Sequence, residues 1–266
     1  MSVLPDPVFV GLPEKFLRWR AGQDQAVLAA LDSPKRAVVL NAPTGFGKTP
    51  VYFAQASLGG YRAGFLTASK GLQSQLLSDF SSSGLVDMRG QNNYRCKALQ
   101  PGGIFYGQGI AAGENCDAGP CHVGAPCSLR RAGCSYFDAV ALARASKFVS
   151  TNYSYWIAQH RFSDGLGAFD LLVLDEAHNA PDELASSLEV ELSDYDVETI
   201  LGAALPHGED AAEWKLWAGQ TLAIGQRRLD KLDSLIKLAR DGGAEIDYSI
   251  LREAHALKNE IGRAHV

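Results

Sequence analysis

Cysteine is scarce in this sequence, and it is confined to one segment. Of 266 residues only five are cysteine, and all five fall between residues 96 and 134. An odd number of cysteines in one stretch argues against a disulfide framework and favours a metal site in a reducing compartment. The chain also lacks an apolar run of membrane-spanning length and a basic-then-apolar signal pattern. We therefore expect a cytoplasmic protein that makes no contact with a membrane.

An excess of basic residues is also missing. The formal net charge is −5, which excludes a uniformly basic nucleic-acid-binding protein. Residues 89–147, which include the cysteines, nevertheless contain more bases than acids. A locally positive segment on an acidic body can meet phosphate, and it can equally be a solvated loop.

Apolar runs and helical periodicities alternate along most of the chain. Short apolar runs predict buried strands at residues 37–40, 63–67, 148–151 and 171–174. Helices are expected at residues 16–31, 49–56, 70–80 and 137–145, with one or two more at 211–240. This alternation predicts an α/β fold, a parallel sheet covered by helices. The pattern stops at residues 90–133, where glycine is dense, and metal ligation would explain such a long irregular stretch.

A glycine-containing loop follows the first expected strand. It reads Ala42, Pro43, Thr44, Gly45, Phe46, Gly47, Lys48, Thr49. Such a loop leaves a strand and opens a helix, and its backbone N–H groups wrap phosphates. We expect Lys48 to reach the terminal phosphates of ATP and the Thr49 hydroxyl to ligate Mg²⁺. Ala42 stands where the strict pattern has glycine.

An acidic motif follows the last expected strand. It reads Asp175, Glu176, Ala177, His178. We expect Asp175 to hold Mg²⁺ and Glu176 to orient or deprotonate an attacking water. His178 would then link the nucleotide site to the parts that move. An acidic helix N-terminus is the alternative interpretation, but the position directly after a buried strand favours the metal site.

Together these motifs resemble the first motor domain of superfamily 2 helicases, specifically the iron–sulfur branch that contains the XPD and DinG helicases. The similarity covers about residues 16–182, with the acidic motif as the DEAH box, followed by Asn179. The further matches are Arg20-Ala21-Gly22-Gln23 (Q motif), residues 66–76 (motif Ia), residues 93–96 and 134–137 at the two ends of the cysteine segment, and residues 151–153. The resemblance implies an ATP-dependent DNA helicase with a RecA-like fold, moving 5′ to 3′. It further implies a monomer that acts on single strands and forks in DNA repair, in a bacterial or phage-infected cell.

The resemblance also implies roles for individual residues. Gln23 would read the adenine, and residues 42–49 would bind ATP. Lys70, Gln73 and Asn152 would contact DNA, although polar residues at the ends of elements are often merely exposed.

Four thiolates suffice for a [4Fe–4S] cluster, and the resemblance implies one here. The expected ligands are Cys96, Cys121, Cys127 and Cys134, with Cys116 as the alternative to Cys121. The spacing alone also allows zinc, held by four thiolates or by three and His122.

These expectations divide the chain into domains. Residues 1–88 and 146–182 would form the motor domain, 89–145 an inserted iron–sulfur domain, and 183–259 the start of a helical arch domain. Residues 260–266 read Glu-Ile-Gly-Arg-Ala-His-Val, which a common sequencing adapter encodes. We therefore expect the natural protein to continue past Asn259. The family's second motor domain and its arginine finger are not in the sequence, so this chain should bind nucleotide weakly and hydrolyse it poorly.

Two other functions fit the same motifs. A nucleic-acid-binding module that has kept the ATP fold would bind DNA without depending on Lys48. Another P-loop enzyme, such as a kinase with a zinc-stabilised insertion, would need a site for a phosphate acceptor, and the sequence contains no sign of one.

Overall fold

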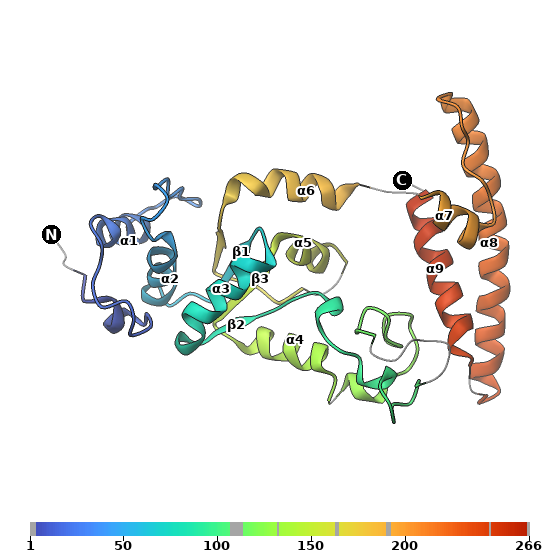
Figure 1. The fold of residues 1–266 in the computed structure, drawn as a ribbon, viewed down its shortest axis with the longest axis horizontal. Helices are drawn as coiled ribbons and strands as arrows, with labels where there is room; N and C mark the ends of the chain where they lie inside the picture. Colours follow the sequence, from blue (N-terminus) through green and yellow to red (C-terminus); the bar gives the residue numbers. More distant parts are fainter. Residues whose placement is uncertain are drawn as a thin grey trace. The chain divides into compact units, whose positions relative to one another are not determined.

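The computed structural model describes residues 4–106, 114–131, 133–162, 165–189, 193–244 and 246–264. The chain divides into two compact units, and each is described by itself (Figure 1). The sheet unit consists of Met1–Arg89 and Ala139–Ser187. The cysteine unit consists of Gly90–Asp138 and Leu188–Val266, so the cysteine segment and the C-terminal helices belong to one unit.

A four-stranded parallel sheet is the centre of the sheet unit. Its strands are β1 (Ala63–Thr67), β2 (Leu85–Asp87), β3 (Phe148–Asn152) and β4 (Leu171–Leu174). They lie in the order β2-β3-β1-β4, and every pair is parallel. Ala63 of β1 pairs with Phe148 on one side and Leu171 on the other, so these strands end at one edge. The expected parallel α/β sheet is confirmed.

Helices surround these strands (Figure 1). They are η1 (Pro7–Val10), α1 (Gln23–Leu31), α2 (Lys48–Leu58), α3 (Lys70–Phe80), η2 (Ser81–Ser83), α4 (Ser135–Ala145), α5 (Tyr153–Phe162), η6 (Ala177–Asn179) and α6 (Ala180–Leu188). The core is aromatic: Phe53 of α2 stacks on Phe65 of β1 at 5.3 Å and on Phe80 of α3 at 4.5 Å. All three rings are buried, so burial of aromatic surface attaches α2 and α3 to the sheet.

The strand expected at residues 37–40 is not formed. Val38 and Val39 are 49% and 89% exposed, and the stretch pairs with none of the described strands. Within the described residues β4 pairs only with β1, which leaves its outer edge open. An apolar run becomes a strand only when it pairs with a neighbouring strand, and this run does not pair with the open edge of β4.

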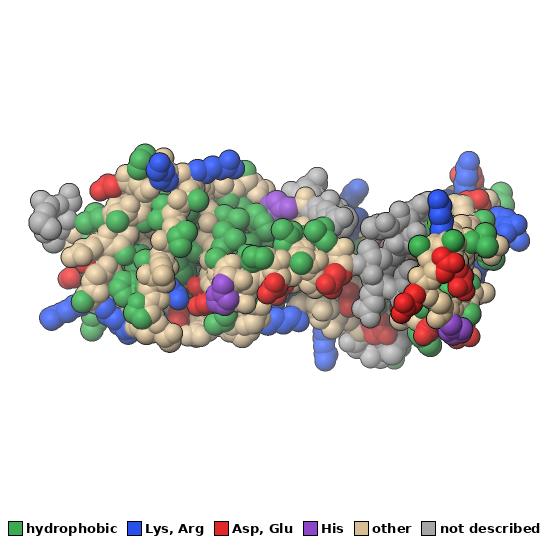
Figure 2. Space-filling view, turned by 90° about the horizontal axis from the view of Figure 1, so that it is seen from above, with side chains coloured by type: hydrophobic (Ala, Val, Ile, Leu, Met, Phe, Trp, Pro, Cys, Tyr) green, Lys and Arg blue, Asp and Glu red, His purple; other side chains and the backbone are tan. Residues whose placement is uncertain are grey.

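Exposed apolar side chains also occur on α6. This helix buries none of its residues, and Leu184 and Leu188, one turn apart, are 49% and 55% exposed. Figure 2 shows hydrophobic side chains gathered on this face of the sheet unit.

Arg62, directly before β1, ties the amino-terminal edge of the sheet to the surrounding loops. Its guanidinium lies 4.0 Å from the centre of the Phe169 ring, and its backbone N–H donates to the Asp170 carboxylate. The guanidinium also donates to the backbone carbonyls of Ala143, Arg144, Ser146, Leu166 and Ala168. One side chain therefore holds the end of α4 and the approach to β4 together.

The cysteine unit combines short turns with a pair of long helices. Its elements are η3 (Gln91–Asn93), η4 (Lys97–Leu99), η5 (Ser128–Arg130), α7 (Asp194–Asp196), η7 (Val197–Leu201), α8 (Ala211–Asp241) and α9 (Tyr248–Ala264). The helix expected at residues 211–240 is confirmed as α8. A Cβ on Gly225 of α8 would lie 3.2 Å from Leu201 and 3.3 Å from Ile261, so the absence of a side chain permits this close packing. Ile261 is buried, and α9 therefore includes residues of the segment that we expect an adapter to encode.

The described helices include none that is long and apolar enough to cross a bilayer.

Candidate functional site

A cavity of about 290 Å³ lies in the sheet unit where β4 ends. Its walls are the glycine-containing loop, the first turns of α2, one face of α3 and the acidic motif. The motifs are more than 120 residues apart in the sequence, and the fold brings them together at the carboxyl edge of the sheet. This is the edge at which ligands bind in open α/β sheets.

Two glycines determine the backbone conformation of the loop that precedes the N-terminus of α2. Gly45 and Gly47 have φ of +85° and +80°, a left-handed conformation that side chains disfavour. A Cβ on Gly47 would also lie 2.7 Å from the Gln23 amide nitrogen. Helix α2 begins at Lys48, so the N–H groups of its first turn lie at the cavity, where an anion can accept them.

Charged groups from both motifs meet in the cavity. Lys48 Nζ lies 3.3 Å from Glu176 Oε1, and His178 Nδ1 lies 3.5 Å from Glu176 Oε2. Burial raises the pKa of the Asp175 carboxyl, the Glu176 charge raises it further, and Lys48 opposes both. Among the described residues other than glycine, only Glu176 has a positive φ, +50°, a strained conformation typical of functional sites. The structure thus brings together Lys48, Asp175, Glu176 and His178.

The oxygen and nitrogen donors of the cavity fit a magnesium nucleotide. Thr49 supplies a hydroxyl and Asp175 a carboxylate, both hard oxygen ligands of the kind Mg²⁺ prefers. Lys48 supplies a cation for phosphate at the start of the same helix.

Gln23 holds the loop and does not line the cavity. It is 3% exposed. Its Nε2 donates to the carbonyls of Phe46 and Gly47 at 2.9 Å, and its Oε1 accepts from the Arg20 backbone N–H at 2.8 Å. Its amide therefore bonds to the loop and to Arg20, and the reading of adenine by Gln23 stays a prediction. Arg20 lines the cavity instead and donates to the Gly45 carbonyl. Arg20 was not among the expected site residues, although it is the first residue of the Q-motif match.

The residues expected to contact DNA differ in accessibility. Gln73 is completely buried, where its amide donates to the Asp87 carboxylate and, at 2.9 Å, to the Met88 carbonyl. Buried partners therefore occupy the Gln73 Nε2 group, and contact of this residue with DNA stays a prediction. Asn152 is half-buried and accepts from the Tyr155 backbone N–H, which caps α5. Lys70 is exposed at the start of α3.

The five cysteines lie in the described part of the cysteine unit. Cys96, Cys116 and Cys134 are buried, and Cys121 and Cys127 are partly exposed. Hydrogen bonding to Cys96, then burial, raises the pKa of Cys116, which is also in hydrogen-bond contact with Cys134. The same bond lowers the pKa of Cys96. Burial raises the pKa of Cys121 to about 11. Cys116, expected only as the alternative to Cys121, is thus the central thiol of a contacting trio.

These thiols are not arranged around an ion. Among the described residues, no group of three or more His, Cys, Asp or Glu side chains is placed to hold a metal. As they stand, the residues do not fit the [4Fe–4S] cluster or the zinc alternative.

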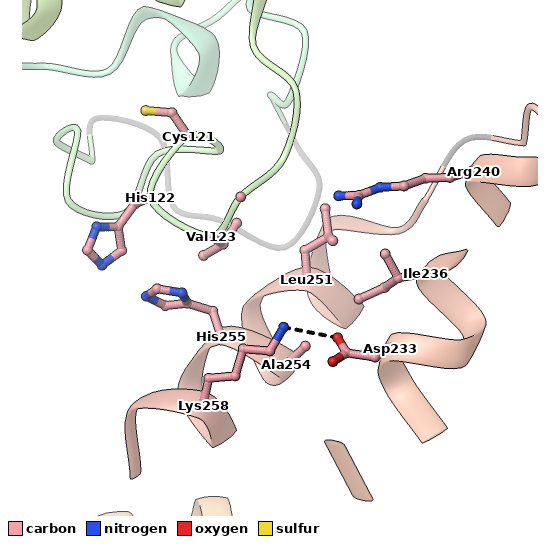
Figure 3. Close-up of a pocket in the computed structure, with 11 residues that line it drawn as sticks. Cys121, His122, Val123, Asp233, Ile236, Arg240, Leu251, Ala254, His255 and Lys258 are labelled. Atoms are coloured by element: carbon pink, nitrogen blue, oxygen red, sulfur yellow. Dashed lines mark hydrogen bonds and ion pairs between the residues drawn. The ribbon is translucent and has the colours of Figure 1, made fainter. Parts of the chain in front are cut away.

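A second cavity, of about 440 Å³, lies in the cysteine unit (Figure 3). The rings of His122 and His255 meet edge to face there at 4.7 Å, and Lys258 pairs with Asp233 at 3.1 Å. Figure 3 shows the Cys121 sulfur pointing away from both imidazoles. His122 Nδ1 lies 3.0 Å from the Gln91 side-chain oxygen. His122 is therefore not placed as a fourth ligand beside the thiols.

Comparison with known families gives one match. The model of the family described as "Type III restriction enzyme, res subunit" matches residues 16–206, well over half of the chain. No curated protein matches the sequence.

Proposed function

The chain belongs to the family described as "Type III restriction enzyme, res subunit", which consists of helicase-superfamily P-loop ATPase domains, and we propose that it is the ATP-binding motor part of an ATP-dependent DNA helicase. One observation carries the proposal: Lys48, Asp175 and Glu176 converge on one cavity beneath a phosphate-binding loop. A phosphate cradle, an acid for magnesium and a second acid for water are the parts that nucleotide hydrolysis needs.

The charges of the cavity suggest how these residues act. Lys48 would neutralise the terminal phosphates, and Thr49 and Asp175 would hold Mg²⁺, which stabilises negative charge on the phosphates. Glu176 would accept the proton of the attacking water. In the free protein Lys48 pairs with Glu176 at 3.3 Å. A phosphate that attracts Lys48 would free the Glu176 carboxylate to act as the base, which couples nucleotide binding to activation of the water.

The nucleic-acid side of the proposal has less support. Lys70 is exposed at the start of α3, and the cysteine segment has an excess of bases. These features favour a phosphate backbone as partner. We propose single-stranded DNA and forks as substrates and movement from 5′ to 3′ by a monomer, and these finer points rest on the resemblance to the iron–sulfur helicases.

An iron–sulfur cluster is a separate part of the proposal. Its support is the number of cysteines between the two motifs and the resemblance to the iron–sulfur helicases. Because the described side chains do not surround a metal, no step above depends on the cluster. Iron, acid-labile sulfide and zinc should be measured on anaerobically purified protein. About four irons and four sulfides per chain would support the cluster, and one zinc without sulfide would contradict it.

Calorimetric titration with magnesium and a non-hydrolysable ATP analogue tests the nucleotide site. The full chain should bind, Lys48→Ala should weaken binding at least about tenfold, and Lys35→Ala should not. Lys35 is the matched control, because it is an exposed lysine of the same unit outside the cavity.

Equal affinity of the wild type and Lys48→Ala would refute the proposed site. DNA binding that is indifferent to nucleotide and to Lys48→Ala would favour a non-catalytic nucleic-acid-binding module.

A further inference from the structure

Tyr52 lines the nucleotide cavity, and its hydroxyl is buried. The residue lies on α2 one turn after Lys48, is 8% exposed and lines the cavity. Its ring packs against Phe65 of β1, with 5.7 Å between the ring centres. The ring is therefore anchored in the core, and its hydroxyl end lies near Thr49, Asp175 and Glu176 of the cavity.

This hydroxyl has no acceptor of normal hydrogen-bond geometry within the described residues. A hydrogen bond from the Thr49 hydroxyl to the phenol oxygen lowers the pKa of Tyr52, and the Asp175 and Glu176 carboxylates act on it electrostatically. Burial, with a further contribution from Asp175, strongly raises the pKa of Tyr52. The phenol therefore stays protonated, so it can donate a hydrogen bond but cannot act as a base.

A buried donor without an acceptor is unfavourable, and folded proteins leave few of them. Tyr52 lies four residues after Lys48 and three after Thr49, so the three side chains share one face of the helix. The other two are the residues expected at the phosphates and at Mg²⁺. The orphaned donor thus faces the place where anionic oxygens would arrive.

We propose that Tyr52 is a positioning residue for the nucleotide and donates its hydroxyl hydrogen bond to a phosphate oxygen. The inference rests on the proposed function, because it requires that this cavity binds nucleotide. Tyr52 would thereby orient the phosphate chain relative to the Glu176 carboxylate, and it takes no part in proton transfer.

Tyr52→Phe tests the inference, because it removes only the hydroxyl. Two quantities should be measured on the full chain: the thermal unfolding midpoint without ligand, and the affinity for a non-hydrolysable ATP analogue with Mg²⁺ and with EDTA. We expect an unchanged or higher midpoint, because the orphaned group is gone. The affinity should fall about tenfold, the typical effect of one hydrogen bond to a charged acceptor, in both buffers.

Tyr155→Phe is the matched control, a buried tyrosine of the sheet unit outside the cavity, and its nucleotide affinity should not change. A lower midpoint with unchanged affinity for Tyr52→Phe would show that the hydroxyl serves folding and overturn the inference. An affinity loss seen only with Mg²⁺ would move the acceptor to the metal site and overturn the phosphate assignment.

Lys48→Ala separates failure of the inference from failure of the proposed function. If it abolishes binding while Tyr52→Phe binds like the wild type, the function stands and the inference fails. If the wild type binds no nucleotide, both fail.

Discussion

Replacement of Arg62 by methionine should weaken the sheet unit more than loss of any surface cation. Methionine keeps an unbranched apolar stem and removes the guanidinium. The five backbone carbonyls that accept from Arg62 would lose a charged donor, and Phe169 would lose the cation above its ring.

The magnitude follows from these contacts. A hydrogen bond to a charged group contributes about 1.5–3 kcal/mol and a cation over a ring about 0.5–1 kcal/mol. Water can replace some of the lost hydrogen bonds, because Arg62 and several of its acceptors are partly exposed. We expect Arg62→Met to lower the free energy of unfolding by about 2–4 kcal/mol. Arg62→Lys should recover about half, because an ammonium has three donors and no planar fork.

Urea unfolding read by hydrogen exchange and mass spectrometry measures this effect in each unit separately. Peptides of β1, β4 and α4 should lose protection, and peptides of α8 and α9 should not. Arg36→Met, at an exposed arginine of the same unit, should stay within about 0.5 kcal/mol of the wild type. An Arg62→Met protein as stable as the Arg36→Met protein would refute the reasoning.

Three further predictions concern other parts of the molecule. Burial raises the pKa of Asp175, so the free energy of unfolding falls as the pH rises from the ordinary aspartate pKa to the raised folded-state value, and the loss is complete above it. Asp175→Asn should therefore stabilise the free protein at neutral pH and make little difference near pH 3, and equal effects at both pH values in denaturant titrations would contradict this. Val39→Asp should lower the free energy of unfolding by less than about 0.5 kcal/mol, because Val39 is exposed. A decrease of more than about 2 kcal/mol would show that residues 37–40 are buried after all. Gly225→Val should lower the free energy of unfolding by about 1–3 kcal/mol, because the new side chain crowds Leu201. Gly219→Val, in open space on the same helix, should not lower it. Similar thermal midpoints for the two variants would refute the packing argument.

Much of the sheet unit was predictable because its signals are local. A short apolar run shows that a segment avoids water, and β1, β3 and β4 follow such runs. The loop and the acidic motif lie next to predicted elements, so their approach to one another follows from parallel strands that end at one edge. Residues 37–40 had the same apolar signal, but the run does not pair with the open edge of β4, and such pairing is a tertiary contact that the sequence does not specify.

Polar side chains are less predictable from sequence. Gln23 and Gln73 matched motifs whose glutamines are expected to face ligands, and in the fold Gln23 bonds to partly buried loop carbonyls and Gln73 to the buried Met88 carbonyl. Tyr52 appeared as an ordinary helical residue, because nothing in its sequence neighbourhood reveals an orphaned hydroxyl. Only the contacts reveal these roles.

The sequence by itself determined the parallel α/β sheet, the glycine-containing loop, the acidic motif and membership of the helicase-superfamily P-loop ATPases, because each depends on residues close together in the chain. The tertiary structure decided which polar groups meet the cavity, that Cys116 lies between Cys96 and Cys134, and that the cysteine segment joins the C-terminal helices in one unit. Burial and hydrogen bonding depend on partners that come from distant parts of the chain, and the packed fold alone specifies those partners.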